Sequence, residues 1–449
     1  MNKASLWLTN KRQCKYKKME SKNDTFGHRF EIKQVLGRGA SGEVHLAFDT
    51  YAQRDVAIKM TRMNLFDDPV AGNRNRKMWL NETRLAGKLQ HPFIVQIYEA
   101  GSTDEFNYIV MEYMAGGSLK QFAAPDKLLP INRLIDILYK VCNALDFATK
   151  MGVLHRDIKP ANVLLGADGD VKISDFGAAF SAESDLTQVD MVGTLPFVAP
   201  EHFRKAHPSQ QNDIYAVGVM AYQLLTGRYP FTAKSPADLI YQKLHEEVLS
   251  LEGWRSDIPQ ALRFAVHRAM HQDRELRYTS WQAFFDDLAA ALPQIAIPED
   301  SRFDSIRFNL MRQFKFFADF SDAEVWETLD ISRTLSMGTG KTIIEEGNKG
   351  NNLFIITSGQ VVVTKNGKEI NRMGAGNCFG EIGYLDEVKH VRSSSVTATM
   401  ALELIEIEGK SLRHASDGLQ SRFSKALLTQ MVAQMRNADQ LIFSMMGID

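Results

Sequence analysis

The feature that constrains this chain most is an ordered series of short motifs in its middle third. The first is HRDIKPAN at residues 155–162, in which an asparagine follows the aspartate by five residues. DFG at residues 175–177 comes next, and APE at residues 199–201 closes the series. Apolar runs at residues 163–165 and 171–173 predict a short hairpin between the first two motifs. Motifs in so specific an order and spacing are not expected to occur together by chance.

A second feature, nearer the N-terminus, is rich in glycine. Gly37, Gly39 and Gly42 form the pattern GxGxxG. Because both flanks have strand-like patterns, we expect a glycine hairpin that can lie over nucleotide phosphates, unlike the strand-to-helix turn of dinucleotide-binding folds. Lys59 follows in an apolar strand, where a buried ammonium needs a partner. Glu82, on the next predicted helix, is well placed to be that partner.

Together these motifs resemble those of the eukaryotic-type protein kinase family over roughly residues 29–292. The strand-like start and the helical pattern beyond it predict a two-lobed α+β unit, which agrees with that family's fold. The resemblance also implies ATP-dependent phosphorylation of protein hydroxyls. Such phosphoryl transfer depends on positioning and charge neutralisation more than on covalent catalysis.

The resemblance implies a role for each polar side chain of the motifs. Asp157 accepts the proton of the substrate hydroxyl, and Lys159 steadies the γ-phosphate. Lys59, oriented by Glu82, holds the α- and β-phosphates. The residues expected to bind ATP are Gly37, Gly39, Gly42, Val44, Ala57, Lys59, Glu112 and Met114.

Asn162 and Asp175 carry hard oxygen ligands of the kind that Mg²⁺ prefers. Lys159 and Thr194 match the serine/threonine branch of the family rather than the tyrosine branch. A catalytically dead pseudokinase is the alternative, but every position that carries chemistry is filled. Three further residues are expected to be structural rather than chemical, namely Glu201, its ion-pair partner Arg277, and Asp213 as the anchor of the catalytic loop.

The segment between the DFG and APE motifs departs from many relatives. Arg156 precedes the catalytic aspartate, which in this family usually means that a phosphate on the activation loop balances its charge. Asp190 occupies the position where many relatives carry the phosphorylated threonine. A fixed carboxylate can do part of that work, with one charge where a phosphate brings nearly two. Ser184 and Thr187 remain candidate phosphorylation sites.

Two positions bear on the choice of substrate. Cyclic-AMP-dependent kinases carry glutamates there that recognise arginines of the substrate, whereas this chain has Ser118 and Gln223. Strict preference for basic substrates is therefore not expected.

A second domain is predicted beyond residue 302. The proline-containing stretch at 293–302 marks a linker, and residues 303–330 have a helical pattern. Short apolar runs with regular glycine turns then extend from residue 343 to 407, which predicts a small antiparallel barrel or jelly roll. The last segment, residues 416–449, is predicted to be an amphipathic helix.

Within this second domain, residues 379–398 read FGEIGYLDEVKHVRSSSVTA. A glycine-acid turn that opens a short helix, followed by an arginine, is a plausible anion site, although an ordinary turn with a surface arginine has the same pattern. With its context, the region resembles the cyclic nucleotide-binding domain family over about residues 303–415. The resemblance implies that Glu381 accepts from the ribose 2′-hydroxyl and Arg392 grips the cyclic phosphate. Further contacts are expected from Gly380, Ile382 and Ser393. The Ser393 hydroxyl can contact a guanine edge, but a small residue there also suits cyclic AMP, which the prediction slightly favours.

The C-terminal helix is the element expected to move. Its apolar face, with Leu428, Met431, Val432 and Met435, is predicted to close over the base or to pack on the barrel. A fixed core helix or the seam of a dimer is the alternative. No helix-turn-helix pattern follows the barrel, which excludes the transcription-factor relatives of this sensor.

Composition sets the remaining limits. The 449 residues are too many for one core, and 53 Lys and Arg against 54 Asp and Glu argue against a nucleic-acid-coating protein. No apolar run is long enough to span a membrane. Three scattered cysteines, Cys14, Cys142 and Cys378, indicate a reducing cytoplasmic compartment. Residues 1–28 are predicted to be a basic leader, for which a membrane-surface tail and an upstream extension before a true start at Met19 are the alternatives.

These patterns predict a serine/threonine kinase of bacterial type that is regulated by cyclic AMP or cyclic GMP. Its expected partners are a protein substrate, ATP with Mg²⁺, and the cyclic nucleotide. Two alternatives remain: a constitutive kinase whose C-terminal domain only docks partners, and a non-catalytic scaffold that binds both nucleotides.

Overall fold

The computed structural model describes residues 28–39, 42–63, 79–80, 82–85, 88–167, 169–176, 180–181, 194–204, 206–291, 304–385 and 390–445. The chain forms two compact units, Met1–Ala296 and Ile297–Asp449. None of the helices in these described ranges is long and apolar enough to cross a membrane.

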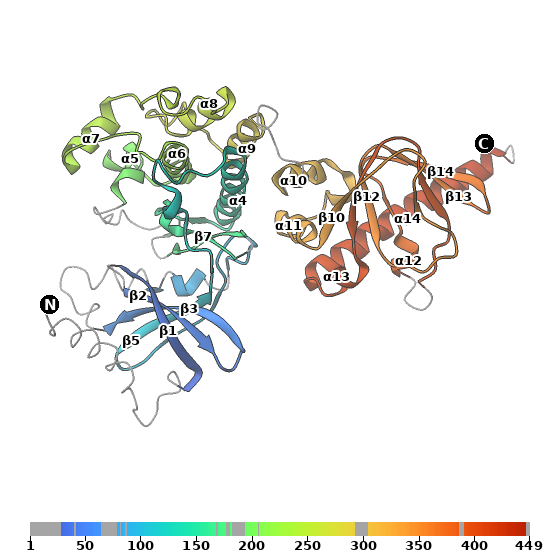
Figure 1. The fold of residues 1–449 in the computed structure, drawn as a ribbon, viewed down its shortest axis with the longest axis horizontal. Helices are drawn as coiled ribbons and strands as arrows, with labels where there is room; N and C mark the ends of the chain where they lie inside the picture. The colour runs from blue at the N-terminus through green and yellow to red at the C-terminus, as the bar shows by residue number, and fades with distance from the viewer. Residues whose placement is uncertain are drawn as a thin grey trace. The chain divides into compact units, whose positions relative to one another are not determined.

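The first unit begins with a five-stranded antiparallel sheet in the order β1-β2-β3-β5-β4 (Figure 1). Successive side chains of a strand point to opposite faces, so the sheet has two apolar faces. One packs Phe30, Ala47, Val56 and Ile58 together, and the other carries Ala57, Ile109 and Met111. The strands are β1 (Phe30–Gly39), β2 (Gly42–Asp49), β3 (Arg54–Arg62), β4 (Ile97–Ser102) and β5 (Phe106–Glu112).

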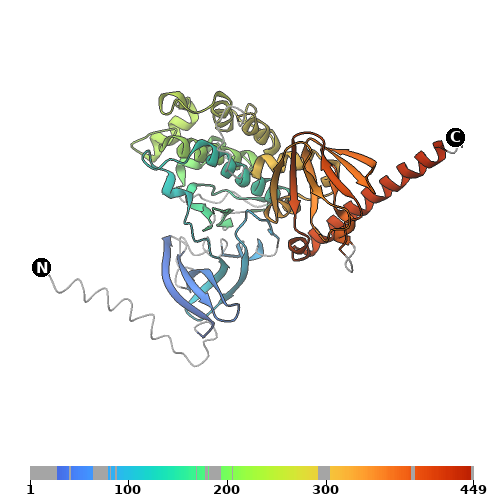
Figure 2. The ribbon, with the colours of Figure 1, turned by 45° about the vertical axis from the view of Figure 1, so that its right-hand side comes forward.

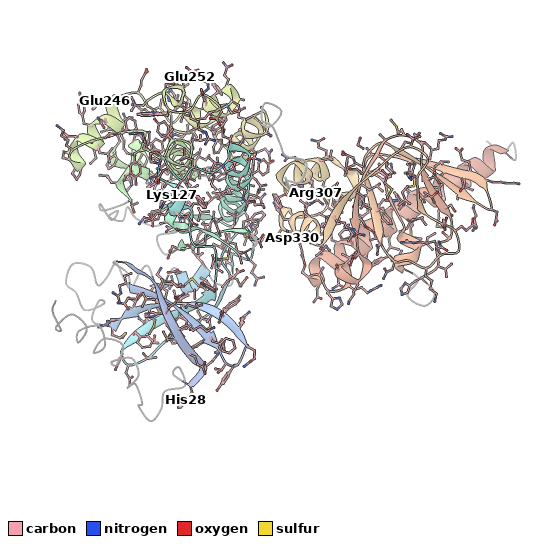
Figure 3. All side chains as sticks on the ribbon, in the orientation of Figure 1. His28, Lys127, Glu246, Glu252, Arg307 and Asp330 are labelled. Carbon is pink, nitrogen blue, oxygen red and sulfur yellow. The ribbon has the colours of Figure 1, made fainter. Side chains whose placement is uncertain are left out.

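A helical lobe follows the sheet in the same unit. Its centre is α6, whose residues are buried along nearly its whole length because other helices surround it. Ser209 caps this helix in a reciprocal pair with Asn212, and Gly227, at a φ of 70°, ends it. Side chains fill the space between the helices (Figure 3). The long helices are α4 (Ile131–Lys150), α6 (Gln210–Thr226), α7 (Pro236–His245), α8 (Gln260–Ala269) and α9 (Trp281–Ala289).

Short elements between α4 and α6 carry the sequence motifs. The predicted hairpin is present, because β7 pairs with β8 from Val163↔Ile173 to Leu165↔Val171. These elements are η3 (Pro160–Asn162), β7 (Val163–Leu165), β8 (Val171–Ile173), η5 (Leu195–Phe197) and α5 (Pro200–Phe203), with β6 (Val153–Leu154) paired to β9 (Phe180–Ser181). Two further short helices are η2 (Leu119–Phe122) and η6 (Leu251–Gly253).

The second unit consists of two four-stranded antiparallel sheets with helices before and after them, as predicted. The sheet orders are β10-β17-β12-β15 and β11-β16-β13-β14. Phe354, Ile356, Val361 and Leu404 belong to the shared apolar core. The strands are β10 (Ser332–Met337), β11 (Thr342–Ile344), β12 (Leu353–Ser358), β13 (Gln360–Lys365), β14 (Lys368–Gly374), β15 (Cys378–Phe379), β16 (Ser395–Ala398) and β17 (Leu402–Ile407).

In the described part of the second unit, six helical segments flank or interrupt these sheets. They are α10 (Asp304–Gln313), η8 (Lys315–Phe317), α11 (Asp322–Asp330), α12 (Glu381–Leu385), α13 (Gly409–Arg413) and α14 (Asp417–Met445). The side chain of Arg307 on α10, labelled in Figure 3, donates to Ser332 Oγ at 2.9 Å and so ties the first of them to β10.

The packing face of α14 differs from the prediction. Leu419, Phe423 and Leu427 are fully buried, whereas Leu428, Val432 and Met435 are 59%, 46% and 66% exposed. Figure 2 shows that the distal part of α14 extends past the sheets of its own unit. Of the predictions for this face, packing on the barrel is therefore wrong for Leu428, Val432 and Met435, whereas closure over the base and a dimer seam stay predictions. Two apolar stripes lie side by side on the helix, and periodicity alone does not say which one faces the domain.

Candidate functional site

Lys59 joins two carboxylates from distant segments of the first unit. Its Nζ lies 3.0 Å from Glu82 Oε2 and 2.6 Å from Asp175 Oδ1. Burial alone would lower the pKa of Lys59, but the two carboxylates outweigh it and raise that pKa. Burial raises the pKa of Glu82, while the charge of Lys59 lowers the pKa of Asp175. The predicted lysine–glutamate pair is therefore formed, and Asp175 is drawn into it.

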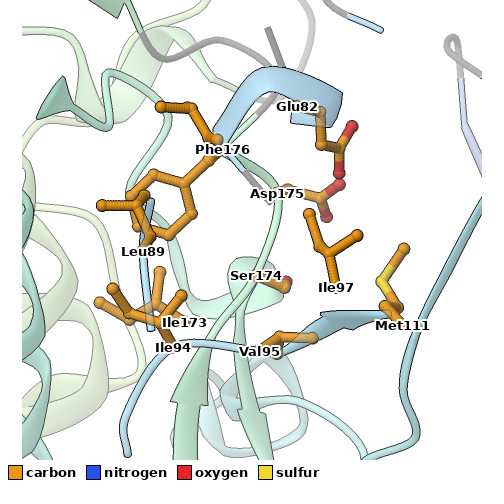
Figure 4. Close-up of a pocket in the computed structure, with 11 residues that line it drawn as sticks. Glu82, Leu89, Ile94, Val95, Ile97, Met111, Ile173, Ser174, Asp175 and Phe176 are labelled. Atoms are coloured by element: carbon orange, nitrogen blue, oxygen red, sulfur yellow. The ribbon is translucent and has the colours of Figure 1, made fainter. Parts of the chain in front are cut away.

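Behind this pair is a hollow of about 370 Å³, which includes space open to solvent. Figure 4 shows the carboxylates of Glu82 and Asp175 pointing toward each other at one end, with Leu89, Ile94 and Phe176 at the other. The Phe176 ring lies 4.5 Å from the His155 ring. The DFG segment thus packs on the catalytic loop, which holds Asp175 beside Lys59.

Asp157 is surrounded by donors. Lys159 Nζ lies 2.9 and 2.7 Å from its two carboxylate oxygens, and Thr194 Oγ1 donates to Oδ1 at 3.0 Å. Asn162 Nδ2 donates to Oδ2 at 3.0 Å and to the Asp157 carbonyl at 2.7 Å. Lys159 Nζ also lies 3.1 Å from Thr194 Oγ1. The carboxylate is therefore held in one orientation by three side chains.

Asp213 on α6 fixes the backbone of the catalytic loop. Its two oxygens accept from the N–H groups of His155 and Arg156, both at 2.8 Å. Arg156 has a φ of 65° and Asp175 a φ of 62°, conformations that cost energy for residues other than glycine. The buried carboxylate of Asp213 compensates part of that cost at the loop. Its predicted role as the anchor of this loop agrees with these contacts.

Asn162 and Asp175 suit a divalent cation that also contacts substrate phosphates. Asn162 uses its amide N–H groups on Asp157, which leaves the amide oxygen as a ligand. Asp175 accepts from Lys59 at Oδ1, which leaves its Oδ2 as a ligand for the cation. Among the described residues no group of three or more His, Cys, Asp and Glu side chains could hold a metal alone. A pair of protein oxygens with phosphate oxygens completing the shell is the mode typical of Mg²⁺.

The glycines of the β1–β2 hairpin differ in whether neighbouring atoms leave space for a side chain. Gly42 has a φ of 134°, and a Cβ there would lie 2.2 Å from the Met60 carbonyl oxygen. A Cβ at Gly37 or Gly39 would meet nothing within 4 Å. No contact within the described chain therefore demands glycine at these two positions, which is consistent with close approach of a ligand such as a phosphate.

The other residues predicted to bind ATP lie on the strands β2, β3 and β5 and in the segment that directly follows β5. Ala57 and Met114 are buried in one apolar cluster, against which Val44 and Leu164 are packed while remaining partly exposed. Sequence reasoning missed Leu164, which lies in β7 and has no motif to mark it. The side chain of Glu112 pairs with Lys172 at 2.7 Å, and its backbone N–H donates to the Gln96 carbonyl at 2.9 Å.

The predicted activation-loop residues have different outcomes. Ser184, Thr187 and Asp190 lie outside the described residues. Thr194 is described and contacts Asp157. Of the two positions linked to substrate choice, Ser118 forms a β-bridge with Leu164. Gln223 is buried in α6.

Glu201 and Arg277 form the predicted ion pair, with Nη1–Oε1 at 2.8 Å and Nη2–Oε2 at 3.1 Å. Arg277 also donates to the carbonyls of Gln211 and His271, so all five of its N–H groups are used. This bidentate pair braces the end of the segment that begins at Thr194.

In the second unit, Arg392 is 8% exposed and lies among backbone groups. Its Nη1 donates to the Gly380 carbonyl and its Nη2 to the Asn352 carbonyl, both at 3.0 Å. Burial lowers the pKa of Arg392, opposed by the charges of Glu381 and Glu406. These bonds account for two of the five guanidinium N–H groups, and the others can serve a phosphate.

The acidic residue of the motif lies close to Arg392. Burial raises the pKa of Glu381, while the N–H groups of Glu381 and Gly380 and the charge of Arg392 oppose that shift. Ile382 is exposed at the start of α12, and Ser393 is half-buried directly after the arginine. Of the predicted set, Gly380 therefore contacts the Arg392 guanidinium through its carbonyl, and Glu381 acts on it through its charge.

Sequence reasoning missed the residues that make room for Arg392 and hold it. A Cβ at Gly350 or Gly383 would come within 3.0 Å of the arginine side chain. Asn352 provides a carbonyl to Arg392, and its side chain donates to Glu406 at 2.6 Å. Of these residues, Gly383 alone belongs to the predicted FGEIG motif, so the sequence marked neither Gly350 nor Asn352.

The lysine–carboxylate pair, the Asp157 cluster and the two lobes are features of the protein kinase class. The buried arginine between antiparallel sheets defines a second unit of the cyclic nucleotide-binding class. Comparison with known families agrees: the description "Protein kinase domain" matches residues 30–288, and "Cyclic nucleotide-binding domain" matches residues 334–417. The chain therefore belongs to the protein kinase family and carries a cyclic nucleotide-binding domain.

Several curated relatives are bacterial kinases. A probable serine/threonine-protein kinase PknB of Lactococcus lactis is 35% identical over 269 residues, which is 59% of this chain and 42% of the relative. The serine/threonine-protein kinase PknB of Mycobacterium leprae is 36% identical over 56% of this chain and 41% of the relative. PrkC of Bacillus subtilis is 33% identical over 59% and 40%. The similarity thus spans less than half the length of these relatives.

Proposed function

We propose that this chain is a serine/threonine protein kinase whose rate is raised by a cyclic nucleotide bound in its second unit. The observation that carries the kinase part is the assembled set of Lys59, Glu82 and Asp175 beside a carboxylate, Asp157, with its own donors. A non-catalytic scaffold would have no need of so complete an arrangement. The relatives named as serine/threonine-protein kinases support the acceptor class.

In this mechanism each side chain has one task. Lys59 binds the α- and β-phosphates of ATP, and Glu82 keeps its ammonium in place. Asp157 accepts the proton of the serine or threonine hydroxyl at one of its carboxylate oxygens, and Lys159 moves from that carboxylate to the γ-phosphate. Mg²⁺, held by Asn162 and Asp175 when bound, neutralises phosphate charge. Catalysis then depends on positioning and electrostatic stabilisation.

The regulatory part rests on Arg392. A buried guanidinium that packs against glycines, and that in the described structure uses two of its N–H groups on backbone carbonyls, suits the phosphodiester of a cyclic nucleotide. Glu381 accepts from the ribose 2′-hydroxyl, and Ser393, directly after the arginine in the sequence, contacts the base. We propose cyclic AMP as the ligand, because a small residue at position 393 suits it.

The test of the regulatory part is calorimetric titration of the full chain with each cyclic nucleotide. Removing a charge-assisted contact costs roughly 1.5–3 kcal/mol, so Arg392→Ala should weaken binding at least about tenfold. Arg372→Ala is a matched control, because that exposed arginine pairs only with nearby Glu369 in the hydrogen bonds described. Absence of binding of either nucleotide to the wild type would overturn the sensor proposal.

The proposal includes three further predictions, which concern location, dimerisation and contact with the protein substrate. Cys142 and Cys378 are free and buried, which supports a reducing, cytoplasmic location. The exposed stripe Leu428, Val432 and Met435 is available for a dimer through α14. The residues that contact the protein substrate are those around Thr194, next to Asp157.

A further inference from the structure

Lys243 is a lysine with no exposed surface in the helical lobe. It lies on α7, and its ammonium reaches the segment between Thr194 and Glu201. Nζ donates to the Pro196 carbonyl at 2.6 Å, to the Val198 carbonyl at 2.8 Å and to the Tyr215 hydroxyl at 3.3 Å. An ammonium has three donors, so these three acceptors satisfy it completely.

Neutral dipoles, rather than a carboxylate, hold this cation. The nearest carboxylate in the cluster, Glu201, has both oxygens engaged by Arg277. The ring of Tyr215 lies 4.8 Å from the Lys243 ammonium and 5.0 Å from the Arg277 guanidinium. Burial and the charge of Arg277 lower the pKa of Lys243 to about 7, against the opposing charge of Glu201. A neutral amine keeps two N–H donors for the carbonyls and can accept from Tyr215, so both protonation states hold the segment.

The segment depends on this side chain because its backbone is irregular. The carbonyls of Thr194 and Leu195 accept from N–H groups of the same segment, at 2.9 and 3.3 Å. Those of Pro196 and Val198 accept from Lys243 instead. Buried carbonyls that lose their donor cost free energy, so the segment would rearrange without the lysine.

The same segment begins at the catalytic carboxylate. Thr194 donates to Asp157 Oδ1 at 3.0 Å, and Glu201 is fixed by Arg277 at the other end. An acceptor hydroxyl has to reach Asp157, so the polypeptide that carries it must run beside Thr194. Among the described residues, 194–198 therefore lead directly away from the carboxylate that the acceptor hydroxyl has to reach, and Pro196 is the one of them that is partly exposed.

We propose that Lys243 is a positioning residue that shapes residues 194–198 to receive the acceptor polypeptide beside Asp157. The proposal rests on the kinase activity proposed above. It assigns to α7 a part in binding the protein substrate, although Lys243 itself touches neither ATP nor acceptor.

The test compares Lys243→Met, which keeps the length and removes the donors, with Leu262→Ala in the full chain. Leu262 is fully buried in α8, so its truncation destabilises the same lobe. It leaves in place the hydrogen bonds from Lys243 to the carbonyls of residues 196 and 198. We expect Lys243→Met to raise KM for a protein acceptor at least about tenfold. KM for ATP and ATP hydrolysis without acceptor should stay within about twofold of wild type. Leu262→Ala should leave both KM values within about twofold.

Hydrogen exchange of residues 194–204 supplies a second readout that needs no activity. Exchange there should be at least about tenfold faster in Lys243→Met than in wild type or Leu262→Ala. An acceptor KM in Lys243→Met equal to that of Leu262→Ala, or unchanged exchange, would overturn the role of Lys243. A wild type that phosphorylates no acceptor would contradict the kinase function instead, and exchange would still decide whether Lys243 holds the segment.

Discussion

Asp157 shows how a single reactive group is prepared by its neighbours. Lys159, Asn162 and Thr194 come from two segments of the chain, and each donates to its carboxylate. The oxygens are therefore oriented before a substrate arrives, so less reorganisation is needed during transfer.

Asp157→Asn should lower the phosphorylation rate by on the order of 10²–10⁴, because an amide does not accept the hydroxyl proton. The amide oxygen can still accept from Lys159 and Thr194, so the fold and ATP affinity should remain near wild type. Initial rates with a protein acceptor and calorimetry with ATP measure the two effects. Asp104→Asn, at an exposed turn, is the control. Wild-type turnover of Asp157→Asn would refute the assignment.

His91 predicts a pH dependence of stability. Burial lowers its pKa to about 4, and its Nδ1 accepts from the Phe93 N–H at 3.2 Å, which requires the neutral ring. The unfolded chain takes up a proton near pH 6.5, whereas the folded chain does so only near pH 4. The free energy of unfolding should therefore fall as the pH drops through that window, by about 2 kcal/mol from pH 7 to pH 5.

Urea unfolding of the first unit at pH 7 and pH 5 measures this contribution. His91→Gln should reduce the difference between the two pH values by about 2 kcal/mol. The exposed His207→Gln should leave that difference as in wild type. Equal differences in all three proteins would contradict the account of His91.

Among the elements, α14 illustrates what a sequence pattern leaves open. Its length and amphipathic character were predictable, but the stripe that packs was not. The buried Phe423 lies 5.2 Å from the ring of Phe320 and 5.7 Å from that of Phe316. The aromatic run 316–320 and Phe423 are a hundred residues apart, and only the folded domain shows that they meet.

Phe423→Ala should destabilise the second unit by about 3–5 kcal/mol, because it removes a fully buried ring from this aromatic cluster. Leu428→Ala, on the exposed stripe of the same helix, should change stability by at most about 0.5 kcal/mol. Hydrogen exchange across residues 304–445 reports both changes. A Phe423→Ala effect no larger than that of Leu428→Ala would mean that the cluster does not hold α14.

The elements that carry motifs were the most predictable. The β7–β8 hairpin follows from two apolar runs, and the two antiparallel sheets of the second unit follow from regular glycine turns. Lys243 and Asn352 had no such signal. Each acts through backbone carbonyls, by donating to them or providing one, and a carbonyl leaves no trace in the identity of its residue.

At the scale of the whole molecule, the chain joins a protein kinase domain to a cyclic nucleotide-binding domain. A ligand changes the kinase rate only if it prefers one of two arrangements of the chain. Motifs predict the presence of both units, but coupling is a difference in free energy between states and is not encoded in any single motif.

The central claim is tested most directly by the phosphorylation rate of the full chain titrated separately with cyclic AMP and cyclic GMP. The account predicts that cyclic AMP raises the rate, and that Arg392→Ala needs at least about tenfold more ligand for the same effect while its basal rate is unchanged. A rate that neither nucleotide alters, although one of them binds, would contradict regulation by this domain.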